Sequence, residues 1–500
     1  MKPGEQSPGF FRVNTCMSKQ IFASPNGQGV GTIQDPTSLQ NGLLLLTPGD
    51  CLLLRAGEYV TDFDGLIITT SGTVENGIIK RVTIKSFNYE KVIINGTFKC
   101  RASYVDIIGL TFTAPNIFPP NTMTRFGNDK NSYTFNLLNK LMPYGSYTWE
   151  GGIGCRVINN IFYNSPGQVE CGSSSSDIEF YGNVFANLGC NLSDNESGEG
   201  IYLQSSDLDV NHKKLLSNNF FVNCALAGMD LWSQTSSSVN GVSCIGNIAA
   251  NNGDGPIQGA PQLNLAAAKG VSNCFIFNNV FFQAKDASMR TVTAAFGRPG
   301  FPPITNTTII NNYFIGNGPS LVGLDSLSSF CHNTLIDGVS AKLINNQGLI
   351  DYNNYYKCFL NQEVDNKNIG NISTWFNNWK NLGYDLNGAS KENDEPTSFS
   401  LVFPNKYRSG RCNVAIINPQ ANETVKVNLI NCGYKNGDKI YMYNTFDLSQ
   451  PPREIIYSNP TIDVSTKNLT VKNRTNAAKN WNTKNSAPYF CAFLLSKDPL

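Results

Sequence analysis

A short apolar segment interrupted by asparagine recurs along the middle of the chain. VINNIFYN, from Val157 to Asn164, is followed by FYGNVFAN, LSNNFFVN, CIGNIAAN, IFNNVFFQ and IINNYFIG. Alternating apolar positions are typical of strands, whereas asparagine is depleted from strands. The repeated asparagine therefore indicates a structural position that an ordinary strand does not have.

The interval between these asparagines predicts the fold. Successive anchors lie 23 to 36 residues apart, at Asn160, Asn183, Asn219, Asn247, Asn279 and Asn312. A repeat of this period made of strands indicates a solenoid, a propeller or an array. The shortest interval fits one coil of a parallel β-helix better than a four-stranded propeller blade. We therefore predict an all-β chain whose stacked coils align the asparagines into an internal hydrogen-bonded ladder.

The residues around each anchor fit the interior of such coils. Apolar residues, most of them phenylalanine, lie two positions after the anchor, and Cys155 and Cys274 lie five positions before theirs. Earlier, YVDIIGLTF has the same alternation with Leu110 at the ladder position, and AKLINN (341–346) is predicted as a final coil. The longer intervals predict lateral loops at 187–200 and 251–262.

Quoted segments near both ends and in the middle carry a family resemblance. TPGDCLLLRAGEYV (47–60), GEGIYLQ (198–204) and the C-terminal LVFPNKYRSGRCNVAIIN and PYFCAFLL resemble the pectate-lyase-like superfamily. The repeat predicts coils from 21 to 365, after a tail at 1–20. The resemblance implies that these coils form a right-handed parallel β-helix, followed by a linker at 366–398 and a small β-sandwich at 399–500. It leaves the activity open, because the superfamily holds lyases, hydrolases, esterases and adhesins.

Two features near the C-terminus are predicted to have structural roles. Trp375 and Trp379 lie four residues apart, which predicts a short helix that pins the linker to the solenoid. The β-sandwich is expected to be either a carbohydrate-binding accessory or a cap over the open end of the solenoid, where strand edges need cover.

Aligning the strand after each corner places a mixed polar column on the outer face of the solenoid. Because side chains alternate along a strand, Glu170, Tyr202, Asp230 and Asn264 face outward, and Gln204 and Trp232 belong to a second outward column. Glu199 ends an inserted loop beside them. Rings can stack on sugars, and paired carboxyls can hydrolyse glycosidic bonds. We therefore predict a glycan groove with Asp230, Glu170 and Glu199 as catalytic acids and Tyr202, Gln204, Trp232 and Asn264 as substrate-binding residues; the alternative is an ordinary solvated face.

Other chemistries have less support in the sequence. The polygalacturonase and pectate-lyase signatures are missing, and the two histidines, His212 and His332, are given surface or structural roles. A lyase would need a cationic base, for which Lys213, Lys214, Arg290 and Arg298 qualify by type only. We interpret both lysines as solvated loop charges. No metal or nucleotide motif occurs, so no cofactor is predicted.

Composition limits the partners. The net charge of +1, with 15% charged residues, argues against nucleic-acid binding, and no apolar run is long enough to span a membrane. The N-terminus shows no signal peptide. The 14 cysteines are interpreted as buried thiols, and the eight sequons as mostly chance.

Two functions remain. The first is polysaccharide binding, with cleavage of hydrolase or lyase type. The second is a non-enzymatic structural or adhesive protein of a virion or cell surface. In either case we expect an extracellular or surface location and allow for a homo-oligomer.

Overall fold

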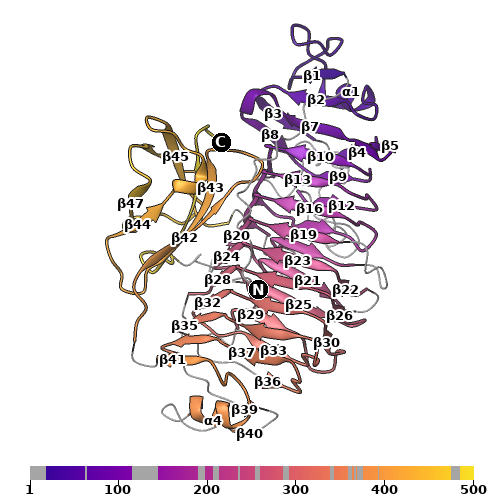
Figure 1. Ribbon diagram of the computed structural model, residues 1–500. Coiled ribbons are helices and arrows are strands. Elements are labelled where there is room, and N and C mark those ends of the chain that lie inside the picture. Colours follow the sequence, from indigo (N-terminus) through magenta and orange to yellow (C-terminus); the bar gives the residue numbers. More distant parts are fainter. Residues whose placement is uncertain are drawn as a thin grey trace, which may run out of the picture.

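The fold is a parallel β-helix with a small β domain against its side, as Figure 1 shows. The computed structural model describes residues 19–61, 65–114, 145–189, 198–205, 213–234, 237–253, 260–284, 292–337, 343–358, 363–364, 367–368, 375–391, 394–474 and 485–500. His212 and Arg290 lie outside these residues. The predicted fold class, a right-handed parallel β-helix followed by a β-sandwich, is confirmed.

Each full coil gives one short strand to each of three twelve-stranded sheets. The first sheet consists of β1 (Gln20–Ala23), β2 (Cys51–Leu54), β7 (Val82–Ser86), β10 (Val105–Ile108), β13 (Arg156–Ile158), β16 (Ile178–Tyr181), β19 (Lys214–Ser217), β23 (Val242–Ile245), β27 (Phe275–Phe277), β31 (Thr308–Ile310), β34 (Ser329–Cys331) and β37 (Leu349–Asp351). The second consists of β3 (Gly57–Val60), β8 (Val92–Asn95), β11 (Thr111–Thr113), β14 (Ile161–Ser165), β17 (Val184–Leu188), β20 (Phe220–Val222), β24 (Ile248–Ala250), β28 (Val280–Phe282), β32 (Tyr313–Ile315), β35 (Thr334–Ile336), β38 (Asn354–Tyr356) and β41 (Ala389–Lys391). The third consists of β4 (Leu66–Ile68), β9 (Phe98–Cys100), β12 (Tyr147–Trp149), β15 (Val169–Cys171), β18 (Ile201–Leu203), β21 (Met229–Ser233), β25 (Leu263–Ala267), β29 (Ala294–Phe296), β33 (Ser320–Val322), β36 (Leu343–Ile344), β39 (Glu363–Val364) and β40 (Lys367–Asn368).

Smaller strands complete the solenoid. A hairpin is formed by β5 (Thr73–Glu75) and β6 (Ile78–Lys80), and a short lateral sheet by β22 (Val239–Asn240), β26 (Val271–Ser272) and β30 (Ile304–Thr305). Successive coils pair in register, so that Val157, Phe180 and Leu216 occupy equivalent positions. The core is built from such columns. Phe162 stacks on Phe185 with ring centroids 5.0 Å apart, as predicted for the position two after the anchor.

The asparagine ladder occupies the corner between the first and second sheets. The backbone N and Nδ2 of Asn219 both donate to Oδ1 of Asn247, each at 3.0 Å, and Nδ2 also donates to the Phe180 carbonyl at 2.9 Å. The same bonds join every neighbouring pair from Asn160 to Asn353. Leu110 continues the column through its backbone N, which donates to Asn160. All six predicted anchors lie in this single internal column.

The residue before each anchor explains the doublets in the sequence. Asn159, Gly182 and Asn218 have φ of 56°, 65° and 57°, and the pattern continues in later coils. A left-handed backbone favours glycine and asparagine over other residues. The doublets Asn-Asn and Gly-Asn therefore encode a tight corner followed by a ladder amide.

The ladder runs further than the sequence predicted and ends in a carboxylate. Asn333 and Asn353 add two coils, and Oδ1 of Asp385 then accepts both donors of Asn353, at 3.0 and 2.9 Å. The other Asp385 oxygen accepts from Tyr355 Oη at 2.6 Å and Trp379 Nε1 at 3.0 Å. The prediction of AKLINN as the final coil was wrong, because β36 within it is followed by the strands of another coil and by β41.

Short helices close both ends of the solenoid. Helix α1 (Leu39–Leu44) packs Leu39 and Leu43 on the first coils, and α4 (Trp375–Asn381) inserts Trp375 and Trp379 into the other end of the core. The predicted pinning role of the two tryptophans is confirmed. Figure 1 shows α1 and α4 at opposite ends of the molecule.

The C-terminal domain packs two sheets around its own apolar core. The larger sheet contains β42 (Phe399–Pro404), β43 (Arg411–Ile417), β48 (Phe490–Ser496), β45 (Lys439–Asn444) and β46 (Arg453–Ile456), and the smaller contains β44 (Thr424–Asn428) and β47 (Thr461–Ser465). A 3₁₀ turn spans Ile430–Cys432 in this domain, and another spans Phe87–Tyr89 in the solenoid.

This domain lies along the side of the solenoid, so the expectation of an end cap was wrong. It covers the outer face of the second sheet, where Phe282 stacks on Phe490 with ring centroids 4.4 Å apart. The physical reason is that Val184, Phe220 and Ile248 face outward there and present an apolar surface. Strands of the second sheet are consequently buried on both faces.

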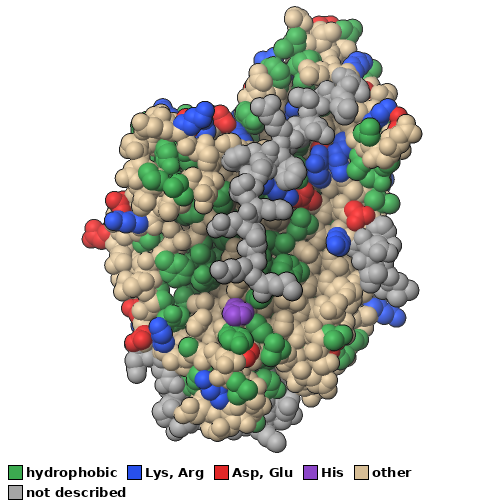
Figure 2. Space-filling model, in the orientation of Figure 1, with side chains coloured by type: hydrophobic (Ala, Val, Ile, Leu, Met, Phe, Trp, Pro, Cys, Tyr) green, Lys and Arg blue, Asp and Glu red, His purple; other side chains and the backbone are tan. Residues whose placement is uncertain are grey.

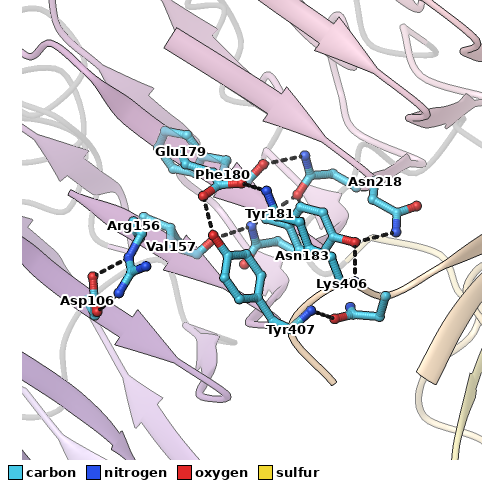
Figure 3. A network of polar contacts seen from close by, with 12 residues as sticks. Asp106, Arg156, Val157, Glu179, Phe180, Tyr181, Asn183, Asn218, Lys406 and Tyr407 are labelled. Atoms are coloured by element: carbon cyan, nitrogen blue, oxygen red, sulfur yellow. Dashed lines mark hydrogen bonds and ion pairs between the residues drawn. The ribbon is translucent and has the colours of Figure 1, made fainter. Parts of the chain in front are cut away.

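Polar contacts complete the interface at the corner above the second sheet (Figure 3). Tyr407 Oη, from the C-terminal domain, donates to Glu179 Oε2 at 2.5 Å, beside a pair within the solenoid in which Arg156 Nε lies 2.8 Å from Oδ1 of the buried Asp106. Lys406 also pairs with Glu179, at 2.5 Å. These bonds fix the loop after β42 against the first sheet.

Among the described residues, the cysteines follow the prediction with one exception. Eleven of these twelve are buried free thiols, whereas Cys51 is disulfide-bonded, and Cys16 and Cys190 lie outside the described residues. Cys51 and Leu53 lie in an outer cluster with Phe22, while Leu52 and Leu54 point into the core. The thiol of Cys51 can therefore form a disulfide with a cysteine outside the coils, whereas thiols that point into the core cannot.

Candidate active site on the third sheet

The third sheet places the predicted outward residues in one row. Thr148, Glu170, Tyr202, Asp230 and Asn264 are register partners on β12, β15, β18, β21 and β25. Neighbouring strands lie about 4.8 Å apart, so the backbones of Glu170 and Asp230 are about 10 Å apart. We call the row from Glu170 to Asn264, with Glu199 beside it, the acidic strip.

The pKa of each carboxyl in the acidic strip is raised above its ordinary value. Burial, then the charge of Glu150, raises the pKa of Glu170 to about 7. Burial also raises the pKa of Asp230 to about 7, against a lowering hydrogen bond from Asn264. Oε2 of Glu170 is buried and has no hydrogen-bond partner among the described residues. These acids can therefore exchange protons near neutral pH.

Glu199 and Asp230 form an electrostatically coupled pair. Burial and then the charge of Asp230 raise the pKa of Glu199 to about 8. Both side chains are 8% exposed. The Gly198 backbone N donates to Oε2 of Glu199 at 3.2 Å, which holds the carboxyl beside β18. Because burial and the charge of Asp230 both oppose ionisation of Glu199, this carboxyl keeps its proton to a higher pH than an exposed glutamate does.

Hydrogen bonds from two amide side chains fix the positions of Asp230 and Tyr202. Asn264 Nδ2 donates to Asp230 Oδ1 at 2.8 Å, and Gln204 Nε2 donates to Tyr202 Oη at 2.5 Å. Burial and then the charge of Asp230 raise the pKa of Tyr202 to about 12, so its hydroxyl remains a donor. Tyr202 is half-buried and lies between two acids in the row.

Trp232 is less open than the alignment suggested. Its ring stacks on Phe301 with centroids 5.1 Å apart, and the Arg298 guanidinium lies 5.0 Å from the Trp232 centroid. A turn outside the aligned strands supplies both neighbours, so the pattern of one strand could not reveal them. Any sugar that stacks on Trp232 must use the part of the ring they leave open.

The interpretation of Lys214 as a solvated charge was wrong. Lys214 is 3% exposed, and its Nζ donates to the carbonyls of Gly172, at 2.8 Å, and Gln204. Burial lowers the pKa of this amine. Lys214 lies five residues before Asn219, the inward position that Cys155 and Cys274 occupy in other coils, so the signal was present in the sequence. Lys213 is exposed, as interpreted.

His332 has the structural role expected of it. It takes the left-handed position before Asn333, with φ of 55°, and its ring stacks on Tyr352 at 4.8 Å. In the part of the chain that the structure describes, no three His, Cys, Asp or Glu side chains are grouped to hold a metal ion. The carboxyls of the acidic strip thus form a row and not a cage.

No family model and no curated protein sequence matches the chain. Among solved structures, the chain is similar to pectate lyase Pel9A at 12% identity, covering 67% of this chain and 79% of that one, with a TM-score of 0.33. It is similar to an alginate lyase from Paenibacillus sp. str. FPU-7 at 15% identity, covering 70% and 96%, with a TM-score of 0.35. It is also similar to PfbA, a surface adhesin of Streptococcus pneumoniae, at 11% identity, covering 67% and 84%, with a TM-score of 0.42.

Proposed function

We propose that the acidic strip binds a polysaccharide and hydrolyses its glycosidic bonds. The observation that carries the proposal is the row on the third sheet, where Glu170 and Asp230 flank Tyr202 as register partners. Glu199 lies beside the row, and burial raises the pKa of all three carboxyls toward neutrality. A glycosidase needs one protonated and one ionised carboxyl at the same pH. The coupled pair Glu199 and Asp230 meets this need near neutrality.

Glu199 and Asp230 divide the two roles between them. In the proposed reaction the protonated member of the pair donates a proton to the leaving oxygen, and the ionised member activates water. Glu170, two coils away, is the alternative base. Asn264 holds Asp230, while Tyr202, Gln204 and the open part of Trp232 bind the sugar.

Hydrolysis is favoured over a lyase reaction by the state of the nearby cations. Lys214 is buried beneath the sheet with its protons directed to two carbonyls, and Arg298 lies over Trp232 and Phe301. Neither is placed as a base on the acidic strip. A uronate polymer would also meet several carboxyls there and gain little charge neutralisation.

The test is a panel of neutral and acidic polysaccharides incubated with the full chain. Hydrolysis releases reducing ends without the ultraviolet absorbance of unsaturated uronates, with a rate maximum between pH 7 and 8. Asp230→Asn and Glu199→Gln should each lower kcat by about 100-fold or more. Exposed Glu454→Gln is the matched control. Cleavage that survives both site variants would exclude this assignment.

A second candidate is a non-enzymatic structural or adhesive protein. The covered face of Trp232 favours it, because a site built for sugar stacking would leave that ring open. This candidate predicts no reducing ends from any polysaccharide. It also predicts unchanged glycan binding, or none, after Asp230→Asn.

We propose an extracellular, cell-surface or virion location. Support comes from the disulfide at Cys51, since disulfides persist in oxidising compartments, and from exposed sequon asparagines Asn422 and Asn468. Among the described residues, no helix is long and apolar enough to cross a membrane. Expression through a eukaryotic secretory route should give a protein whose mass falls on N-glycosidase treatment.

A further inference from the structure

A cleft lies between the first sheet and the C-terminal domain, on a different face of the solenoid from the acidic strip. Its volume is about 420 Å³, which is within the usual range for small-molecule sites. The turn after β7 supplies Phe87, Asn88 and Tyr89, β7 supplies Lys85, and the loop after β42 supplies Tyr407 and Arg408. The site exists only because the two domains dock.

The charge of this interdomain cleft is positive. Lys85 and Arg408 line it, and no Asp or Glu is among its described lining residues. Acids that contact or neighbour its lining residues are paired: Glu90 binds Arg55 at 3.0 Å, Asp498 pairs with Arg408, and Glu179 pairs with Lys406. Lys85 forms no ion pair within the described residues. Figure 2 shows charged side chains more numerous on the upper part of the molecule than over the lower coils.

The cleft also offers ring surfaces and an unused donor. Tyr89 is 57% exposed, and the Arg408 guanidinium lies 3.8 Å from its ring centroid, which holds the ring in place. Tyr407 is fixed by its bond to Glu179 (Figure 3). Nε of Arg408 is buried and has no hydrogen-bond partner among the described residues. Rings, amides and cations without a free acid match a ligand with an apolar ring face, hydroxyls and a carboxylate.

We propose that the interdomain cleft binds an acidic saccharide of two or three units, with Lys85 paired to a carboxylate and Tyr89 packed on a sugar ring. This site is independent of hydrolysis at the acidic strip. It is suited to hold the charged part of a glycan against the molecule, away from the acids of the third sheet.

The experiment is isothermal titration of the full chain with digalacturonate, its methyl ester and a neutral disaccharide. Digalacturonate should bind saturably, and its affinity should fall with added salt. Lys85→Ala, Tyr89→Ala and the methyl ester should each weaken binding about tenfold. Exposed Lys269→Ala is the matched control and should bind as the parent does. Thermal unfolding of each variant checks the fold.

The outcomes separate this site from the acidic strip. Binding that Asp230→Asn preserves and Lys85→Ala weakens supports the interdomain cleft even if no polysaccharide is cleaved. No saturable binding, equal binding of acid and ester, or indifference to both cleft variants would overturn the proposal. Binding lost in Asp230→Asn and kept in Lys85→Ala would also overturn it, since the ligand would then occupy the third sheet.

Discussion

The asparagine ladder and the acidic strip are both polar columns that cross the same coils, yet they differ in how their groups are satisfied. In the ladder, Asn160 to Asn353 repeat one set of bonds at 2.8 to 3.2 Å, and each ladder asparagine is fully buried. In the acidic strip every rung carries a different side chain, and three acids retain protons through burial. A satisfied, repeated column stabilises a fold, whereas an unrepeated column of costly buried charge indicates a binding or catalytic role.

The largest loss of stability is expected from a substitution in the ladder. Asn247→Ala removes the acceptor of both Asn219 donors and two bonds of its own Nδ2, at a fully buried position. We expect a loss of about 4 kcal/mol in the free energy of unfolding, measured by urea denaturation. Exposed Asn26→Ala should change it by less than about 0.5 kcal/mol. A loss of under 1 kcal/mol at Asn247 would mean that the ladder is not a major source of stability.

The raised pKa values in the acidic strip should make the free energy of unfolding depend on pH. The folded pKa of Glu199, about 8, lies above its ordinary value of 4.5, so the folded state binds more protons between these pH values. Stability therefore falls as pH rises from about 4.5 through 8. Glu199→Gln should remove up to about 5 kcal/mol of this decline, from about 3.5 pH units at about 1.4 kcal/mol each, and should melt higher than the parent at pH 8.5. Equal melting profiles of the variant and parent across this range would show that Glu199 is not a protonated acid.

The end of the ladder offers a smaller test. Asp385→Asn keeps an acceptor for Asn353 and places an amide where Tyr355 and Trp379 donate. Trp379 Nε1 can only donate, so it has no partner once an amide NH₂ faces it. We expect the free energy of unfolding to fall by about 2 kcal/mol. Calorimetry should show it as a lower Tm. The nearby exposed Asn381→Ala serves as the control, and a Tm equal to the parent's would contradict the role of Asp385.

The smallest effect concerns the cover over Trp232. Arg298→Ala removes a cation–π contact worth about 0.5 kcal/mol and should make Trp232 fluorescence easier to quench with acrylamide. Trp149, Trp375 and Trp379 are fully buried and should not contribute to the change. Subtracting the signal of Trp232→Phe isolates this ring. Unchanged quenching would show that Phe301 alone sets its exposure.

Repetition decided how much the sequence could predict. The six anchors, their core partners and the outward row from Glu170 to Asn264 follow from alternation and register, which are local properties. Asn333 and Asn353 escaped because their coils are short and begin CHN and DYN, without the usual doublet. The buried site of Lys214 was readable from its position before Asn219, but the residue type argued against it.

Contacts between distant segments were beyond the sequence. The docking of Phe490 on Phe282, the stacking of Phe301 on Trp232 and the cleft between Lys85 and Arg408 each join residues from unrelated parts of the chain. No periodicity marks such pairs. The raised pKa values of Glu170 and Asp230 likewise depend on burial by neighbours that their own strands do not specify.

The ladder also has an electrical direction. Every ladder amide from Asn160 to Asn353 directs one Nδ2 hydrogen and its backbone N–H to the following coil, and its Oδ1 accepts from the preceding coil. The amide dipoles therefore add along the column, and their positive end faces Asp385. A negative charge is thus the natural terminus of the column, and a carboxylate, which has no proton to pass on, finishes it. An engineered protein could therefore gain or lose whole coils ahead of Asp385, while that aspartate and its two aromatic donors would have to remain last.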